Sequence, residues 1–143
     1  MVVKKNSLLF FGLAAVLVLL DQLSKYLILF INPTWSAGIL TIHLIKNTGA
    51  GFGILKGQAL LLGFISLLVA LIIIFSRKKI IQDQVPLCLF SLLLGGVLGN
   101  FIDRIFRGYV IDFIDFRFWP AFNIADATIT ISIIGLLIYY WKK

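Results

Sequence analysis

The chain contains no glutamate, one cysteine, one histidine and few charged residues of any kind. Only 13% of its 143 residues are charged, whereas roughly a quarter are charged in an ordinary soluble domain. This scarcity of charge excludes a typical water-soluble globule. A disordered chain is excluded as well, because disorder goes with low hydrophobicity and 61% of these residues are hydrophobic. The single Cys88 also excludes a disulfide within the chain.

Long apolar runs take the place of the missing charges, and the mean hydropathy is +1.07. Crossing a hydrocarbon core takes about 20 helical residues, and four runs approach or exceed that length. The sequence therefore predicts an all-α integral membrane protein with four transmembrane helices, built as one domain over residues 1–143. We expect the helices over residues 7–31, 59–76, 85–102 and 123–141, with the longer connections at 32–58 and 103–122.

The charges that are present number 13 Lys+Arg against six acids, a net of +7. A basic balance can indicate a nucleic-acid partner, but most of these cations flank apolar runs, which is the pattern of membrane topology. We therefore expect no nucleic acid, both termini on the cytoplasmic side, and the two longer connections outside. The cations expected on the cytoplasmic side are Lys4, Lys5, Arg77, Lys78, Lys79, Lys142 and Lys143.

The outer connections contain stretches that are typical of β-strands. Ile39–Ile45 is rich in β-branched residues, and residues 109–116 are partly β-like. We expect a small extracytoplasmic β-rich cradle that lies on the membrane surface. If the second stretch is extended, Asp112 and Asp115 point to opposite faces, so that at most one of them faces inward.

Polar residues at membrane depth are candidates for function, since an ionisable group there is unfavourable by about 2.5–3.5 kcal/mol. Asp21 and Lys25 lie four residues apart and are expected to form an ion pair on one helix face. Asp126 falls in the first turn of the last helix, where the helix dipole favours a carboxylate. Asn123, three residues earlier, is placed to cap that helix. A purely structural role stays open for all of these residues.

A third polar group follows a pattern of small residues in the third apolar run. Gly95 and Gly99 form a small-xxx-small face that allows close helix packing. We expect the small residues Gly95, Gly96 and Gly99 to leave room for a substrate helix or an acyl chain. Asn100 and Arg104 share a helix face just beyond it. Asp103 either pairs with an arginine or holds the helix end.

Elimination leaves carboxylates as the candidate chemistry. One histidine, His43, and Cys88 without any glutamate cannot build the usual zinc-ligand sets, so no metal is expected. Ser24 and Lys25 are neighbours on a helix and do not face each other. Two aspartates held close together, in contrast, share one proton, so that one acts as base toward water and the other as acid.

Five segments in order resemble the motif set of the bacterial lipoprotein signal peptidases, also called signal peptidase II, which are aspartic peptidases of family A8. The resemblance runs from the first predicted helix to the last. One departure is Gly51, where alanine is more usual in the family. The segments are Asp21-Gln-Leu-Ser-Lys25, Asn47-Thr-Gly-Ala50, Gly99-Asn-Phe-Ile-Asp-Arg104, Val110-Ile-Asp112-Phe and Phe122-Asn-Ile-Ala-Asp126.

The resemblance implies an endopeptidase of the bacterial cytoplasmic (inner) membrane that removes signal peptides from prolipoproteins, cleaving before a diacylglyceryl-modified cysteine. It also implies a monomer without a cofactor, in contact with membrane lipid and inhibited by cyclic peptides of the globomycin type. The catalytic dyad maps onto Asp112 and Asp126. The substrate-binding or supporting residues map onto Asp21, Lys25, Asn47, Gly99, Asn100, Arg104 and Asn123.

Two other classes of protein are compatible with the composition. A small transporter would use Asp21, Asp112 and Asp126 as a proton relay, which requires acids at several depths in the membrane. A structural membrane subunit would use its acids only to pair with cations such as Lys25 and Arg104.

Overall fold

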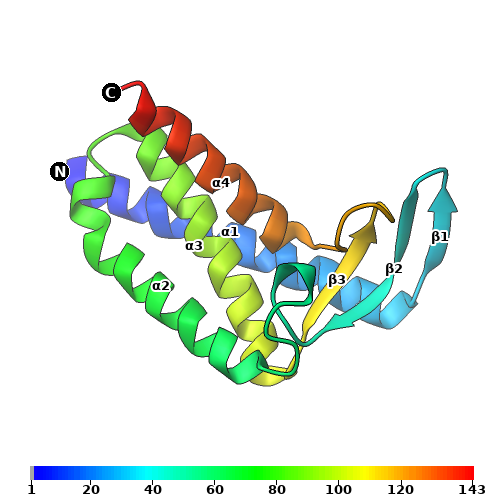
Figure 1. The fold of residues 1–143 in the computed structure, drawn as a ribbon. Coiled ribbons are helices and arrows are strands. Elements are labelled where there is room, and N and C mark those ends of the chain that lie inside the picture. Colours follow the sequence, from blue (N-terminus) through cyan, green and yellow to red (C-terminus); the bar gives the residue numbers. More distant parts are fainter. Residues whose placement is uncertain (1) are drawn as a thin grey trace.

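The computed structural model describes residues 2–143 of the chain, and four of its helices are long and apolar enough to cross a membrane. These helices confirm the fold class expected from the apolar runs. Figure 1 shows them as one bundle, with a small sheet at one end. The helices are α1 Val2–Ile31, α2 Ala59–Ile80, α3 Gln84–Phe106 and α4 Ile124–Trp141.

Helix α3 is the centre of the bundle and packs against each of the other three helices. Glycines make this close packing possible: a Cβ on Gly95 would lie 2.7 Å from a Leu17 methyl group, and one on Gly96 would lie 2.7 Å from the Ala125 carbonyl oxygen. The expectation that these glycines leave room for a substrate is therefore wrong. The space beside them is filled by α1 and α4 of the protein itself.

The sheet has three antiparallel strands in the order β1–β2–β3: β1 Thr34–Ala37, β2 Leu40–Asn47 and β3 Val110–Asp115. Gly38, with φ +59°, supplies the positive φ that a two-residue hairpin loop needs at its first position. A short 3₁₀ helix, η1 Gly51–Gly53, lies between β2 and α2. The β-structure expected in both longer connections is confirmed.

The chain after β3 folds back onto that strand before α4 begins. The Phe122 amide donates to the Ile114 carbonyl at 3.0 Å, and the Phe113 and Ile114 amides donate to the Phe122 carbonyl at 3.1 and 2.9 Å. This pairing brings Asn123 and the first turn of α4 beside the middle of β3, as the strand and helix in Figure 1 show. Two segments that carry aspartates are thereby held together.

Helix α3 runs further than the apolar run that predicted it. Asp103 and Arg104 belong to its last turns and not to the following connection, where the sequence placed them. Asp103 forms an ion pair with Arg107, the residue that caps the C-terminus of the helix. Gly108, with φ +75°, then turns the chain into β3. The boundary differs because a charge that is paired locally does not end a helix.

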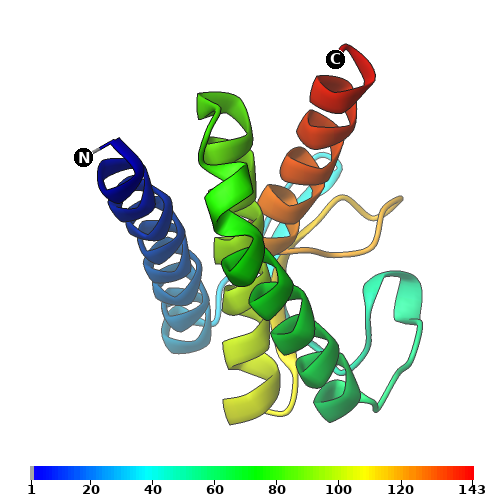
Figure 2. The ribbon, with the colours of Figure 1, turned by 90° about the vertical axis from the view of Figure 1, so that its left-hand side faces the viewer.

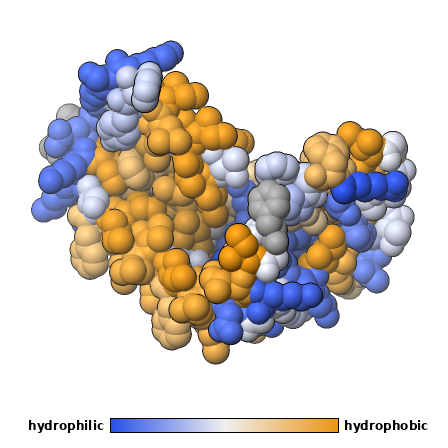
Figure 3. All heavy atoms as spheres, viewed as in Figure 1, coloured by the Kyte–Doolittle hydropathy of each residue, from blue (hydrophilic) through white to orange (hydrophobic). Residues whose placement is uncertain are grey.

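The outer surface of the helices is apolar and has the character of a lipid-facing surface. Large side chains such as Leu8, Phe64, Phe75 and Leu137 are mostly exposed. Figure 3 shows hydrophobic residues over the helices and hydrophilic residues gathered at the two ends of the molecule. Both termini lie at the end of the bundle away from the sheet (Figures 1 and 2).

Candidate active site

Asp112 and Asp126 come from different elements and meet through one asparagine. Asp112 is the third residue of β3 and is 1% exposed, and Asp126 lies in the first turn of α4. The Asn123 side-chain amide donates to Asp112 Oδ1 at 2.7 Å, and the Asn123 backbone amide donates to Asp126 Oδ2 at 3.2 Å. The side-chain oxygen of Asn123 accepts from the Asp126 amide at 2.9 Å, which completes a capping box. The two carboxyl groups therefore bond to the same residue.

Two further asparagines complete the hydrogen bonding of the two carboxyl groups. Asn47, at the end of β2, donates to Asp112 Oδ2 at 2.9 Å, and Asn100, on α3, donates to Asp126 Oδ1 at 2.7 Å. The ion pairs found within residues 2–143 involve other acids, and neither Asp112 nor Asp126 takes part in one. Neutral amide donors hold a carboxyl group in place without tying up its charge, so either group is free to exchange a proton.

The environment of Asp112 favours its protonated form. Burial and, next in size, the negative charge of nearby Asp126 together raise its pKa from 3.8 to about 7. Hydrogen bonds from Asn47 and Asn123 act against this shift and do not overcome it. Asp115, three residues along the same strand, shows the opposite behaviour: hydrogen bonds from the Arg117 amide and from His43 lower its pKa. The inward and outward faces of β3 thus give two aspartates different chemistry.

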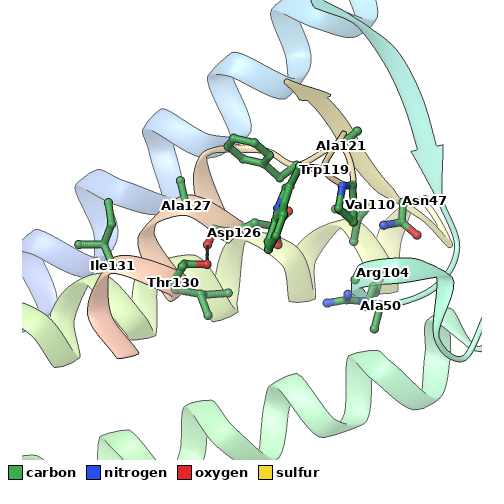
Figure 4. Close-up of a pocket in the computed structure, with 14 residues that line it drawn as sticks. Asn47, Ala50, Arg104, Val110, Trp119, Ala121, Asp126, Ala127, Thr130 and Ile131 are labelled. Atoms are coloured by element: carbon green, nitrogen blue, oxygen red, sulfur yellow. Dashed lines mark hydrogen bonds between the residues drawn. The ribbon is translucent and has the colours of Figure 1, made fainter. Parts of the chain in front are cut away.

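Each of the two carboxyl groups borders a cavity. Asp126 lines a cavity of about 490 Å³, and Asp112 lines a smaller one of about 240 Å³ beside Lys46 and Lys56. The cavities adjoin, since Asn47, Ala50, Pro120 and Ala121 line both. The larger cavity is mostly apolar where it follows α4, along Ala127, Ile129 and Ile131 (Figure 4).

Arg104 brings a positive charge to the larger cavity. Its Nη1 atom reaches Ser66 Oγ at 3.4 Å, whereas its Nε atom is buried and has no hydrogen-bond partner within the described residues. Figure 4 shows Arg104, Trp119 and Asp126 around the same opening. A buried donor without a partner is unfavourable by about 1–3 kcal/mol, so this atom is suited to an acceptor brought by a ligand.

A buried ionic cluster lies between α1 and α3, next to these carboxyl groups. Lys25 Nζ is 2.8 Å from Asp21 Oδ2, which confirms the expected pair, and 3.0 Å from Asp103 Oδ2. All three side chains are fully buried. Gly99 is needed here for close approach, because a Cβ at that position would lie 2.5 Å from Asp21 Oδ2. Asp103 was absent from the expected site residues, although it lies within the segment Gly99-Asn-Phe-Ile-Asp-Arg104 and four residues before Arg107.

The remaining candidates lie elsewhere. His43 contacts Asp115 at 3.1 Å on the outer face of the sheet, and Cys88 is exposed on α3. Residues 2–143 contain no group of three His, Cys, Asp or Glu side chains placed to hold a metal ion. In a structural membrane subunit the acids would pair with cations, whereas neither Asp112 nor Asp126 takes part in an ion pair among residues 2–143. A proton relay requires acids at several depths in the membrane, whereas Asp21, Asp112 and Asp126 all lie near the same end of the bundle.

Comparison with known proteins places this geometry in a family. Residues 13–142 match the model of family Peptidase_A8, described as signal peptidase (SPase) II. The lipoprotein signal peptidase of Moorella thermoacetica is 42% identical over 139 residues, which cover 92% of this chain and 91% of that protein. The lipoprotein signal peptidase of Caldanaerobacter subterraneus is 38% identical over 136 residues, covering 90% of this chain and 94% of that protein.

A solved structure agrees with the sequence comparison. It is described as a bacterial membrane enzyme and superposes with a TM-score of 0.86 at 33% sequence identity, covering 93% of this chain and 87% of the other. The likeness extends over the bundle and the sheet together, since so little of either chain is left out.

Proposed function

The chain belongs to the signal peptidase II family, and from this premise we propose that Asp112 and Asp126 are its catalytic pair. As a member of the family it is a membrane-embedded aspartic endopeptidase that removes signal peptides from prolipoproteins. The observation that carries the proposal is the pair of carboxyl groups bonded to Asn123, next to adjoining cavities and without an ion-pair partner among residues 2–143.

The proposed reaction uses the pair as one acid and one base. The raised pKa of Asp112 leaves the shared proton on that residue in the free enzyme, so Asp126 takes a proton from the attacking water. The water oxygen bonds to the carbonyl carbon of the scissile peptide. Asp112 then gives its proton to the amide nitrogen as the carbon–nitrogen bond breaks. Water and the two carboxyl groups balance the reaction without a metal or a cofactor.

Arg104 is proposed to stabilise the oxygen that becomes negative during the attack. Its charge lines the same cavity as Asp126, and its buried Nε has a free hydrogen to donate. Fixed donors at such a position act more strongly in a site that excludes water than they would in solution. Asn47, Asn100 and Asn123 are proposed to hold the pair in place through the amide bonds described above.

The larger cavity suits a lipid-modified substrate. Its volume of about 490 Å³ falls in the range of sites that bind small ligands, roughly 300–1,000 Å³. Its apolar wall follows α4 toward the lipid-facing part of the helix, through Ile129 and Ile131. We propose that this wall receives an acyl chain of a diacylglyceryl-modified cysteine, so that the peptide bond before that cysteine reaches the carboxyl pair. Globomycin-type cyclic peptides are proposed to block the same cavity.

The bundle is proposed to lie in the bacterial cytoplasmic membrane, as a monomer with both termini in the cytoplasm. The seven cations of the sequence pattern surround the end where the termini lie, which is the distribution typical of a cytoplasmic face. The sheet and the carboxyl pair would then lie at the outer surface, where water has access to them.

Purified protein in detergent tests the catalytic pair on a lipid-modified prolipoprotein. Asp112→Asn and Asp126→Asn are each expected to lower the cleavage rate by at least about 100-fold, because general acid–base groups contribute on that order. Asp115→Asn is the matched control, since it changes the same residue type on the outer face of β3, and it is expected to cleave normally. Mass spectrometry of the products locates the cleaved bond. Rapid cleavage by either of the first two variants contradicts the assignment.

A further inference from the structure

The buried ionic cluster contains charges that line neither cavity, and burial of a charge is unfavourable unless its partners compensate. Asp21, Lys25 and Asp103 are fully buried between α1 and α3. Neither cavity wall includes any of them. The hydrogen bonds that these three side chains make, in addition to their ion pairs, indicate the role of the cluster.

Each of the two buried carboxylates accepts the backbone amide that directly precedes one of the paired aspartates. Asp21 Oδ1 accepts from the Ala125 amide at 3.0 Å, one residue before Asp126. Asp103 Oδ2 accepts from the Ile111 amide at 3.1 Å, one residue before Asp112. Lys25 joins these two anchoring carboxylates through its single Nζ atom. A continuous chain of bonds therefore links the start of α4 to the middle of β3.

Lys25 makes one more bond, toward Asn100. Its Nζ donates to the Asn100 side-chain oxygen at 3.0 Å. Because that oxygen is occupied, the Asn100 amide nitrogen faces Asp126, to which it donates at 2.7 Å. Lys25 thus helps to fix the orientation of Asn100, together with the Asn123 side-chain amide, which donates to the same oxygen at 3.3 Å.

We propose that Asp21, Lys25 and Asp103 form an ionic clamp that sets the separation of the Asp112 and Asp126 carboxyl groups. The inference rests on the proposed function of that pair. Asp103 is thereby a positioning residue that acts through the Ile111 amide, and Asp21 is its counterpart through the Ala125 amide. Separation matters because two carboxyl groups share one proton only when they are close, and a misplacement of about 1 Å lowers a rate by on the order of 100-fold.

Two double variants open the clamp without changing net charge. Asp21→Ala with Lys25→Met releases Ala125 and removes one of the two donors to the Asn100 oxygen, while Asp103 keeps Arg107 as its partner. Asp103→Ala with Arg107→Met releases Ile111, while Lys25 keeps Asp21. Removing both members of a buried pair is often neutral for stability, in contrast to removing one. If one double variant does not fold, the other still provides the test.

The expected result is a loss of kcat on the order of 100-fold in each double variant, with KM close to that of the wild type. Burial and repulsion by Asp126 keep Asp112 protonated, and a wider separation weakens the repulsion. The alkaline limb of the pH–rate profile of Asp103→Ala with Arg107→Met is therefore expected to move to lower pH. The other double variant also removes Lys25, whose charge lowers the pKa of Asp112, and is tested by its kcat and KM. The charged groups that face the pair from neighbouring elements are Arg104, Lys25, Lys46 and Lys56. Enzyme concentration is set by titration with a tight-binding inhibitor, so that unfolded protein does not lower kcat.

The matched control is Asp83→Asn with Lys143→Met, which also removes an ion pair, here an exposed one of 2.7 Å at the opposite end of the bundle. It is expected to keep the wild-type kcat and pH profile. The clamp is overturned if both clamp variants keep the wild-type profile while Asp112→Asn is inactive, and the proposed function then stands. It is also overturned if kcat falls in Asp103→Ala with Arg107→Met and the alkaline limb of its pH–rate profile does not move. Normal cleavage by Asp112→Asn overturns the proposed function, and the clamp with it.

Discussion

At the scale of single residues, Asp112 and Asp115 show what the sequence can predict about the direction of a side chain. Alternation along an extended strand predicts that they face opposite sides, and the structure confirms this, with Asp112 buried and Asp115 paired with His43. Which of them faces inward depends on the register of β3 against β2 and on the fold-back at Phe122. Those contacts join distant segments, so the alternation alone could not decide between the two residues.

Protonation of Asp112 links stability to pH. Its pKa is about 7 in the folded protein against an ordinary 3.8, so between these values the folded protein keeps a proton that the unfolded chain has released. The stabilisation is complete at the acidic end of this window and is lost as the pH rises through 7. We expect wild-type protein to be less stable at pH 8 than at pH 5, and Asp112→Asn to reduce this difference by up to a few kcal/mol, at about 1.4 kcal/mol per pKa unit.

Denaturation midpoints of detergent-solubilised protein at both pH values measure this effect. Asp115→Asn is the control, because the lowered pKa of Asp115 keeps its titration below the window. An identical pH dependence in wild type and Asp112→Asn would show that Asp112 is already ionised at pH 5.

The ionic cluster shows why the role of Asp103 could not be predicted from the sequence. Asp21 and Lys25 pair within one helix, a spacing that the sequence displays directly. Asp103 meets Lys25 across the α1–α3 interface, 78 positions away along the chain. No local sequence pattern indicates a contact between residues so far apart. The sequence could therefore indicate only an arginine on the same helix face, here Arg107, as the ion-pair partner of Asp103.

At the scale of elements, Asn123 serves both a helix and the site. Its side-chain oxygen caps α4 by accepting from the Asp126 amide, and its side-chain nitrogen donates to Asp112. Asn123→Ala is expected to lower the free energy of unfolding by about 1 kcal/mol, the usual effect of losing an N-cap, and to abolish most cleavage.

A serine at this position separates the two roles. Asn123→Ser keeps an oxygen that can cap the helix but is too short to reach Asp112. We expect a midpoint of denaturation near that of the wild type together with low activity. Wild-type activity in Asn123→Ser would mean that the bond to Asp112 has no part in catalysis.

The helices themselves were largely predictable, and their ends were not. Apolar length predicted all four spans, because hydrocarbon leaves few alternatives for a backbone. Helix α2 continues through Arg77–Lys79, where cations favour a helix C-terminus, and α3 continues through its charged last turns. The low hydropathy of these residues predicts a loop, whereas ion pairing and the helix dipole stabilise them in a helix.

At the scale of the whole molecule, the bundle is expected to cross the membrane with the sheet outside and both termini in the cytoplasm. In intact cells that carry a Cys88→Ser background, a membrane-impermeant thiol reagent should label Gly38→Cys in the β1–β2 turn. Lys142→Cys should react only after the membrane is permeabilised, because its end of the bundle carries most of the cations. Labelling of position 142 from outside, with position 38 protected, would contradict the proposed orientation.

Carbon NMR measures whether Asp112 and Asp126 titrate as one coupled pair. The chain has only six acidic side chains, all aspartates, so labelling their carboxyl carbons gives a spectrum that can be assigned by single variants. The account predicts one resonance that titrates near pH 7 and is missing in Asp112→Asn. In Asp126→Asn its midpoint should fall, because the neighbouring negative charge is gone. A midpoint that is unchanged by Asp126→Asn would show that the two carboxyl groups do not interact, and would contradict the account.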